Sequence, residues 1–257
     1  MLTRSGAEIH VDRSGDDTVV YKLHRPGTDP RQLASRLRVA AASPALLSPL
    51  SAEPEAVGDR WRTTWPHVET VVQQPECLPW TEAGGLLARL HREEPTGRVP
   101  PHGWPQRMRR ALNVLREHPC VTVRRAAAAL PDEAWRAGSA GRPISVVHGD
   151  FHLGQLGRRD GGSPWLLIDV DDLGVGDPAW DLARPAGFWA AGLLPDDDWA
   201  AFVDAYRDGD GPALPAGDPW PVLEPFARAA VVQAAAHHRD DELLMAACTR
   251  MVELEKT

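Results

Sequence analysis

The chain has 257 residues, of which 43% are hydrophobic, and its formal net charge is -8 at pH 7. This length and apolar content are enough for a folded domain with a substantial core, and they exclude an intrinsically disordered chain. There is no apolar run of the roughly 18 residues that a membrane helix needs, no signal-peptide core, and no paired motif among Cys77, Cys120 and Cys248, so we expect a soluble, cytoplasmic protein without disulfides.

Charge is distributed unevenly along the chain. Residues 1–149 hold 20 basic and 16 acidic side chains, whereas residues 150–257 hold 8 and 20. An acidic second half disfavours a nucleic-acid partner and could favour a cationic small molecule, although an ordinary solvated acidic surface explains it equally well. The basic run at residues 107–110 falls on a predicted helix, where we expect a solvated face.

The first predicted element is a β-hairpin over residues 7–23, with a turn at residues 14–17. Its second strand carries Lys22, and the only other lysine in the chain is Lys256. In a chain that otherwise uses arginine, a strand lysine suits a site that needs a compact charge on phosphate oxygens. The alternative is an exposed strand lysine without a role.

A helix is predicted over residues 31–42, followed by a strand over residues 60–66 that ends where Pro66 cannot donate to a sheet. The remaining apolar periodicity is helical. Helices are predicted over residues 81–92, 105–118, 121–130, 196–207, 221–238 and 240–255.

The most informative segment is residues 146–183. Two apolar runs of strand length, residues 144–147 and 165–168, each stop at a polar cluster that contains an aspartate, Asp150 and Asp169 respectively. We therefore expect the two aspartates at neighbouring strand ends. Two carboxylates in that arrangement suit a site that holds a divalent cation close to the proton of a nucleophile.

The next motif, Gly176–Ala183, is typical of a helix start. Asp177 would cap the helix, Pro178 would occupy its first position, and Asp181 falls in the first turn near the positive end of the helix dipole. A single aspartate of this kind is often only a cap or a solvated side chain. Three such motifs in this order favour a functional segment.

These motifs resemble the catalytic half of the aminoglycoside phosphotransferase and choline kinase-like family, small-molecule kinases that share the protein-kinase fold. His148-Gly149-Asp150 is similar to the start of that family's catalytic loop, and Ile168-Asp169 is similar to a shortened Asp-Phe-Gly motif. The resemblance implies that Asp150 takes the proton of the acceptor hydroxyl, and that Asp169 binds magnesium at the nucleotide phosphates.

The resemblance also assigns further residues. Gln155 stands where the family usually has asparagine, in a His-Leu-Gly-Gln sequence that resembles the maltokinase-like branch, and its amide oxygen can still bind a metal. Lys22 would bind the nucleotide phosphates. The hinge that meets adenine would be Trp65, Pro66, His67 and Val68. The supporting residues would be His148, Asp177 and Asp181. Apart from the resemblance, Asp171 and Asp172 are candidates for the metal shell or for contact with a cationic acceptor, with a solvated loop carboxylate as the alternative for at least one of them, and His152 is a further candidate at the acceptor site.

The implied fold is α+β and bilobal, protein-kinase-like, with a small antiparallel-sheet N-lobe over residues 1–68 and a mainly helical C-lobe over residues 69–257. The implied activity is transfer of the γ-phosphate of ATP or GTP, with Mg²⁺, to a hydroxyl of a sugar, an aminoglycoside or a related metabolite, cationic ones included. We expect a monomer or homodimer with no nucleic-acid or membrane partner.

Two rival functions stay open. The predicted helix over residues 31–42 lacks the acid that pairs with the strand lysine in this family, and only Glu53, Glu55 and Glu69 offer substitutes. Together with Gln155, this gap is compatible with a kinase-like module that binds a nucleotide or metabolite without turnover. The other rival is a metallohydrolase that uses His148, Asp150 and His152 as ligands, which leaves Lys22 and Asp169 unexplained.

Overall fold

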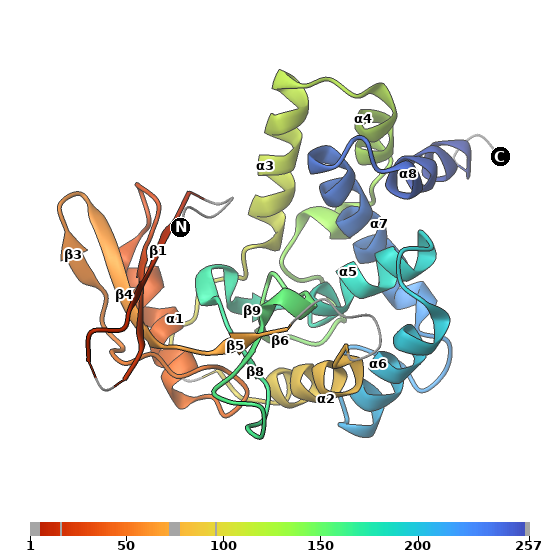
Figure 1. Ribbon diagram of the computed structural model, residues 1–257. Coiled ribbons are helices and arrows are strands. Elements are labelled where there is room, and N and C mark those ends of the chain that lie inside the picture. Colours follow the sequence, from red (N-terminus) through yellow and green to blue (C-terminus); the bar gives the residue numbers. More distant parts are fainter. Residues whose placement is uncertain (1–5, 16, 72–77, 96, 255–257) are drawn as a thin grey trace.

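The structure is a computed structural model that describes residues 6–15, 17–71, 78–95 and 97–254. Figure 1 shows a small lobe built on an antiparallel sheet beside a larger, mainly helical lobe. The sheet has the strand order β1-β2-β4-β3. Its strands are β1 (Glu8–Asp12), β2 (Val19–Leu23), β3 (Glu55–Val57) and β4 (Arg60–Pro66).

The predicted hairpin and the predicted strand at residues 60–66 are both confirmed, and β2 lies between β1 and β4. Lys22 is paired with Ile9 on one side and with Thr63 on the other. Of the predicted turn, Asp16 lies outside the described residues. Both backbone edges of β2 are thus paired, and the Lys22 side chain is buried.

Helix α1 (Pro30–Ala42) follows the hairpin, as predicted. The Asp29 side chain accepts hydrogen bonds from the backbone N–H groups of Arg31 and Gln32, and Pro30 occupies the first helical position, where no N–H is needed. The helix buries Leu33 and Leu37. No acidic residue lies on it.

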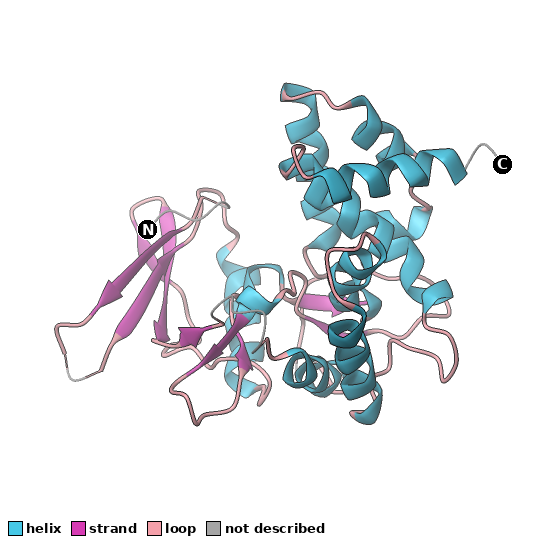
Figure 2. Cartoon of the chain, turned by 45° about the vertical axis from the view of Figure 1, so that its right-hand side comes forward, coloured by secondary structure: helices cyan, strands magenta, loops and turns pink. Residues whose placement is uncertain are grey.

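The larger lobe consists mainly of helices, which Figure 2 shows gathered on one side of the molecule. The predicted helices are confirmed to within two residues over the described part of the chain. They are α2 (Trp80–His91), α3 (Trp104–Glu117), α4 (Val121–Ala128), α6 (Asp196–Asp208), α7 (Trp220–His237) and α8 (Glu242–Leu254). A further helix, α5 (Ala179–Ala190), follows the predicted helix start at residues 176–183. Helices α2 and α6 approach so closely that a Cβ at Gly84 would lie 2.2 Å from the carbonyl oxygen of Phe202.

Two small sheets lie between the main sheet and the helices. The first pairs β6 (Ser145–Val147) with β9 (Gly174–Gly176). The second has the order β5-β7-β8, formed by β5 (Glu69–Thr70), β7 (Leu156–Arg158) and β8 (Leu166–Leu167). Residues 67–68 connect β4 to β5, so the chain passes there from the main sheet to the second small sheet. The predicted domain boundary at residues 68–69 stays a prediction.

The prediction that Asp150 and Asp169 follow neighbouring strands is wrong. The strand before Asp150 is β6 and the strand before Asp169 is β8, and these belong to different sheets. An apolar run indicates that a strand is buried but not which strand it pairs with, because backbone groups of any strand can supply the partner. The two aspartates are brought together by loops instead.

The cysteines form no disulfide among the described residues, where Cys120 and Cys248 are free. Cys77 and Lys256 lie outside the described residues. Within the described ranges, none of the helices combines the length and the apolar character needed to cross a bilayer.

Candidate active site

Lys22 meets two carboxylates from a loop that is far away in the sequence. Its Nζ lies 2.6 Å from Oδ1 of Asp169 and 2.8 Å from Oδ2 of Asp171. Oδ1 of Asp171 lies 3.3 Å from Nδ1 of His24, which is also on the small lobe. We call Lys22, His24, Asp169 and Asp171 the lysine cluster.

The lysine cluster keeps its ion pairs charged. Burial acts to lower the pKa of Lys22, but the charges of Asp169 and Asp171 outweigh it and raise that pKa above its ordinary value. Burial likewise acts to raise the pKa of Asp171, and Lys22 and His24 lower it below its ordinary value. The Lys22 side chain is 9% exposed, whereas those of Asp169 and Asp171 are 39% and 33% exposed. The two carboxylates therefore form the exposed side of the cluster.

A strained turn orients the carboxylates of Asp169 and Asp171. Asp169 has φ 64° and ψ 80°, a left-handed conformation that is uncommon outside glycine. Its side chain accepts a hydrogen bond from the backbone N–H of Asp171, 3.4 Å away, at the start of the 3₁₀ helix Val170–Asp172. Successive residues of a 3₁₀ helix project about 120° apart. Asp171 and Asp172 therefore point to different sides.

Asp172 and Asp150 belong to a second cluster. Nη1 of Arg107 lies 2.8 Å from Oδ2 of Asp150 and 2.7 Å from Oδ2 of Asp172, so one guanidinium joins the two loops. Nη2 of Arg184 lies 3.0 Å from Oδ1 of Asp150. Nη2 of Arg110 lies 3.8 Å from Asp172. We call Asp150, Asp172, Arg107, Arg110 and Arg184 the arginine cluster.

Asp150 is largely enclosed, with a side chain that is 15% exposed. Burial raises its pKa above the ordinary value of an aspartate, and the charges of Arg107 and Arg184 offset only part of this effect. A carboxylate with a raised pKa is a better proton acceptor than an ordinary one. The environment therefore suits a base.

Close backbone contacts hold the two loops together. Gly149 has φ 82°, and a Cβ there would lie 2.2 Å from the carbonyl oxygen of Asp172. That carbonyl also accepts a hydrogen bond of 2.9 Å from the backbone N–H of Gly103, at the start of α3. Only a residue without a side chain fits at position 149. Asp150 is thus positioned against the turn that carries Asp169.

The loop that carries Asp150 is anchored by a fully buried carboxylate. Asp181 accepts hydrogen bonds from the backbone N–H groups of His148, at 2.6 Å, and Gly149, at 2.8 Å. Nε2 of His91 lies 3.0 Å from the same carboxylate, and Nδ1 of His91 lies 2.8 Å from the hydroxyl of Tyr206. Burial acts to raise the pKa of Asp181, but these partners lower it below its ordinary value.

His148 connects the two loops through its ring. Its Nε2 lies 2.8 Å from the carbonyl oxygen of Ile168, the residue before Asp169. Because a carbonyl oxygen only accepts, Nε2 carries the proton, and the free Nδ1 can accept from the backbone N–H of Asp150, 3.4 Å away. The ring thus fixes the spacing between the aspartate loops.

Asp177 has a structural setting. Its two carboxylate oxygens accept hydrogen bonds from Nε and Nη2 of Arg142, at 2.8 and 3.0 Å. Asp177 also accepts from the backbone N–H of Ala179, the first residue of α5. The helix therefore begins one residue later than predicted, and Pro178 precedes it.

The remaining predicted residues lie around the two loops. The backbone carbonyl oxygen of Gln155 accepts a hydrogen bond of 2.8 Å from the backbone N–H of Ile168, so Gln155 is adjacent to the turn of Asp169. Burial lowers the pKa of His152 to about 3, with the charge of Arg184 acting in the same direction. His152 is therefore neutral and lies beside the arginine cluster.

The predicted hinge lies between the main sheet and the second small sheet. Trp65 is buried, and its Nε1 donates to the hydroxyl of Thr63. Pro66 ends β4, and His67 is exposed. Val68 packs against Gly157, where a Cβ would lie 2.6 Å from the Val68 side chain.

The structure corrects the expectation for the partner of Lys22. Glu53 pairs with Arg38 and Glu55 pairs with Arg62, and Glu69 lies 3.9 Å from Arg158. None of the three meets Lys22, because each lies beside an arginine elsewhere. In place of an acid, α1 presents Arg36, whose Nε donates to the carbonyl oxygen of Leu173 at 2.8 Å.

The sequence-based interpretation missed the arginines. Arg107 was assigned to a solvated helix face, but its side chain is only 21% exposed and contacts both aspartate loops. Arg184 was not singled out. One signal was available: Arg184 is three residues after Asp181, so the two share a face of α5. The contacts of Arg107 span too much sequence to leave a local pattern.

The donor set fits a hydrated magnesium ion that also binds phosphates. Asp169 and Gln155 offer a carboxylate and an amide oxygen, and magnesium commonly takes one or two protein ligands and fills its other positions with water and phosphate. Among the described residues, no group of three histidine, cysteine or acidic side chains could hold a metal alone. The metallohydrolase alternative therefore lacks a site in the described part of the chain.

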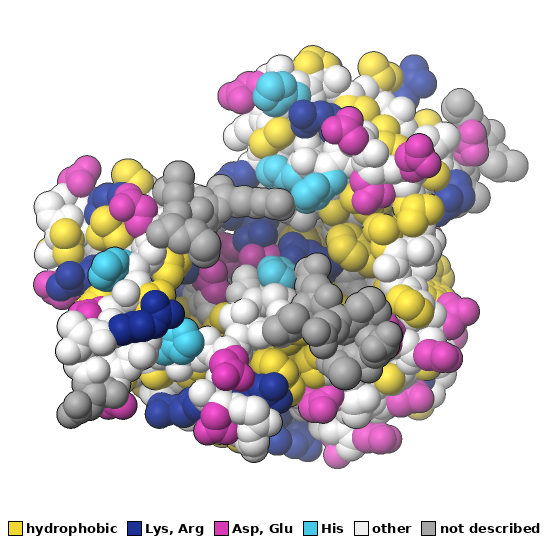
Figure 3. Space-filling view, viewed as in Figure 1, with side chains coloured by type: hydrophobic (Ala, Val, Ile, Leu, Met, Phe, Trp, Pro, Cys, Tyr) yellow, Lys and Arg dark blue, Asp and Glu magenta, His cyan; other side chains and the backbone are white. Residues whose placement is uncertain are grey.

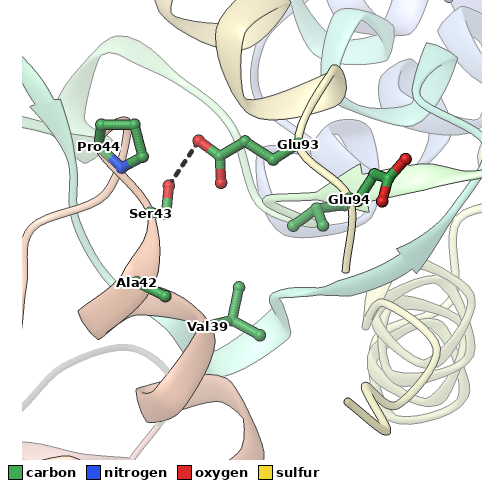
Figure 4. Close-up of a pocket in the computed structure, with 7 residues that line it drawn as sticks. Val39, Ala42, Ser43, Pro44, Glu93 and Glu94 are labelled. Carbon is green, nitrogen blue, oxygen red and sulfur yellow. Dashed lines mark hydrogen bonds between the residues drawn. The ribbon is translucent and has the colours of Figure 1, made fainter. Parts of the chain in front are cut away.

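Figure 3 shows a hollow between the two lobes in which basic, acidic and histidine side chains gather. A different pocket, of about 250 Å³, is lined by the end of α1, by Glu93 and Glu94, and by Val146. Figure 4 shows Ser43 and Glu93 pointing toward each other there, joined by a hydrogen bond of 2.8 Å. No member of either cluster lines this pocket.

Comparisons with known proteins agree with this geometry. Residues 15–220, more than half of the chain, match the family described as "Phosphotransferase enzyme family". A comparison with curated proteins found no match.

Solved structures show the same fold. The choline kinase LicA from Streptococcus pneumoniae superposes with a TM-score of 0.67 at 12% identity, over 100% of this chain and 92% of that chain. An aminoglycoside 3'-phosphotransferase of type VIII gives 0.59 at 20% identity, over 91% of each chain. A spectinomycin phosphotransferase, solved with ADP and spectinomycin, gives 0.58 at 13% identity, over 96% of this chain and 85% of that chain. The shared fold is the bilobal, protein-kinase-like one.

Proposed function

We propose, from the premise that this chain belongs to the phosphotransferase enzyme family, that it transfers the γ-phosphoryl group of ATP to a hydroxyl of a small molecule. At the coarser level the protein is a small-molecule phosphotransferase with a hydroxyl acceptor. The observation that carries the finer proposal is the contact of 2.6 Å between Lys22, buried on its strand, and Asp169, on its strained turn. That pair joins a phosphate-binding cation to a metal-binding carboxylate.

The lysine cluster is the proposed nucleotide side. Lys22 would contact the phosphate oxygens as a compact charge. Asp169 and Gln155 would hold magnesium, which when bound neutralises charge on the phosphates. Residues 65–68 would meet the base through backbone groups. The choice between ATP and GTP has no side-chain signature in that segment.

Asp171 is the proposed positioning residue for Lys22. In this family the strand lysine is oriented by an acid on the following helix, and α1 has none. Asp171 lies 2.8 Å from Lys22 and supplies the missing carboxylate from the other side. This contact supports an active kinase over a module that binds a nucleotide without turnover.

Asp150 is the proposed base. Its raised pKa and its place beside the Asp169 turn support this role. The acceptor oxygen would form a bond to the γ-phosphorus while the bond from that phosphorus to the bridging oxygen of ADP breaks. The hydroxyl proton would pass to Asp150. Positioning and charge neutralisation supply most of the acceleration in such a transfer.

The proposal is tested by ATP turnover with a panel of sugars, amino sugars and small alcohols, read as ADP release and as the mass of the product. Asp150→Ala and the better-matched Asp150→Asn should abolish transfer while leaving Mg·ADP binding within about threefold of wild type, because Asp150 would contact the acceptor and not the nucleotide. Full transfer by Asp150→Asn would remove Asp150 from the role of base.

A further inference from the structure

The base is held by two guanidinium groups. Each carboxylate oxygen of Asp150 has its own arginine: Oδ2 meets Arg107 at 2.8 Å, and Oδ1 meets Arg184 at 3.0 Å. These arginines come from α3 and α5, two different elements of the helical lobe. Any molecule whose hydroxyl reaches Asp150 therefore passes beside at least one of them.

The arginine cluster carries an excess of positive charge. Among the described residues, Arg107, Arg110 and Arg184 form ion pairs with two carboxylates, Asp150 and Asp172. The neighbouring His152 adds no negative charge. The net charge of the arginine cluster is therefore positive. The net charge of residues 150–257 as a whole is negative, because they hold 8 basic and 20 acidic side chains. Within a cleft the local groups decide which ligand is attracted.

The guanidiniums of Arg107 and Arg184 are held by several contacts and are poorly exposed to water. The Arg184 side chain is 15% exposed and lies 5.8 Å from the ring centre of Trp104. Nε of Arg107 is buried and has no hydrogen-bond partner among the described residues. A partly desolvated cation in excess of its partners is costly unless an anion joins it. The cluster is thus incomplete without one.

Two sources could supply that anion, the transferred phosphoryl group or the acceptor. Lys22 and a metal held by Asp169 would face the proposed triphosphate. Lys22 contacts Asp169 and Asp171, whereas Arg107 contacts Asp172. The arginines contact the base itself, where the acceptor arrives. The acceptor is therefore the better candidate for the source of this anion.

We propose that the natural acceptor bears an anionic group, a carboxylate or phosphate, close to the hydroxyl that is phosphorylated, and that Arg184 and Arg107 bind this group. The inference rests on the proposed function. The fork of a guanidinium matches the two oxygens of either anion. Its charge also offsets the repulsion between an anionic acceptor and the triphosphate.

The test compares acceptors that share a carbon skeleton and differ in charge: glucose, glucuronate and glucosamine, and glycerol, glycerate and serinol. Phosphoryl transfer from Mg·ATP is measured as kcat/KM, with ATP hydrolysis in the absence of acceptor as the measure of competence. Wild type is compared with Arg184→Gln, Arg184→Lys and the control Arg228→Gln. Arg228 pairs with Glu224 on α7, outside the cluster.

We expect an anionic member to exceed its neutral counterpart by about tenfold or more, the scale of one charge-assisted hydrogen bond. Arg184→Gln should remove most of that preference, Arg184→Lys should retain part of it, and Arg228→Gln should leave it unchanged.

Three results would overturn the inference while leaving the proposed function intact: a preference for the neutral or cationic members, transfer to no anionic member by an enzyme that hydrolyses ATP, or an equal loss in Arg184→Gln for every acceptor and for ATP hydrolysis. The last result would assign Arg184 to the transferred phosphoryl group. Absence of both hydrolysis and transfer in the wild type would instead defeat the proposed function, and this inference with it.

Discussion

The lysine cluster and the arginine cluster meet different sides of one short turn and have opposite charge excess. Lys22 faces two carboxylates on one side, whereas three arginines face two carboxylates on the other. A negative excess calls for a cation and a positive excess calls for an anion. Under the proposed function, magnesium and the acceptor would therefore be kept apart by charge as well as by position.

Apart from the loss of the proposed base Asp150, the largest expected effect comes from removing the charge of Asp169 in the lysine cluster. Asp169→Asn keeps the shape of the side chain but should lower kcat/KM for transfer by about a hundredfold or more, because it removes a carboxylate that would bind magnesium. Steady-state kinetics over a range of magnesium concentrations checks this. Asp160→Asn, an exposed loop residue, is the control. Equal activity of the two variants would contradict the assignment of the lysine cluster.

The buried anchor beneath the arginine cluster should matter most for stability. Asp181→Asn leaves the N–H groups of His148 and Gly149 with one uncharged acceptor in place of a carboxylate. We expect the free energy of unfolding to fall by about 2–4 kcal/mol, measured by urea denaturation. Asp197→Asn, on the exposed first turn of α6, should change it by less than about 0.5 kcal/mol.

The sign of the pH dependence follows from the pKa of Asp181. This pKa is lowered in the folded state, so its stabilisation is present at neutral pH and is lost as the pH falls through the acid range. Asp181→Asn should therefore lose less stability on acidification than wild type does. A parallel loss in both proteins would show that Asp181 is not a stabilising carboxylate.

Asp171 offers a finer test of the lysine cluster. If it positions Lys22, Asp171→Asn should raise KM for ATP by about tenfold, with a smaller change in kcat, because the ammonium loses one of its two anionic partners. Asp171→Glu restores the charge and should recover part of the affinity. An unchanged KM in Asp171→Asn, or no recovery by Asp171→Glu, would leave Asp169 as the only functional partner of Lys22.

We expect the arginine cluster to affect the acid limb of the pH dependence of kcat/KM. Burial raises the pKa of Asp150, and the charges of Arg107 and Arg184 act against that rise. Arg184→Gln removes one of these charges, so the pKa of Asp150 should rise further and the acid limb of kcat/KM should move to higher pH. Arg184→Lys keeps the charge and should move it less. A limb that stays in place or moves to lower pH contradicts Asp150 as the titrating base.

Local patterns in the sequence predicted most of the fold. The hairpin, α1 and the helices of the larger lobe follow from apolar periodicity and from residues such as Asp29 and Pro30 at a helix start. Lys22, Asp150 and Asp169 could be singled out because each lies in a short recognisable motif or is compositionally unusual.

The contacts within the site could not be predicted in the same way. The partner of Lys22 is 147 residues away in the sequence, and Arg107 meets a carboxylate 65 residues away. Such pairs depend on how strands and helices pack, and a strand pattern does not specify its neighbours, as the separate sheets of β6 and β8 show. Residue motifs thus singled out the two aspartate loops, and packing determined their partners.

The most direct test of the two-sided site is a crystal structure with magnesium and a non-hydrolysable ATP analogue. The account predicts the metal on Asp169, phosphate oxygens within hydrogen-bond distance of Lys22 Nζ, and the γ-phosphate directed toward Asp150. A nucleotide bound away from Lys22, or a metal bound without Asp169, would contradict it.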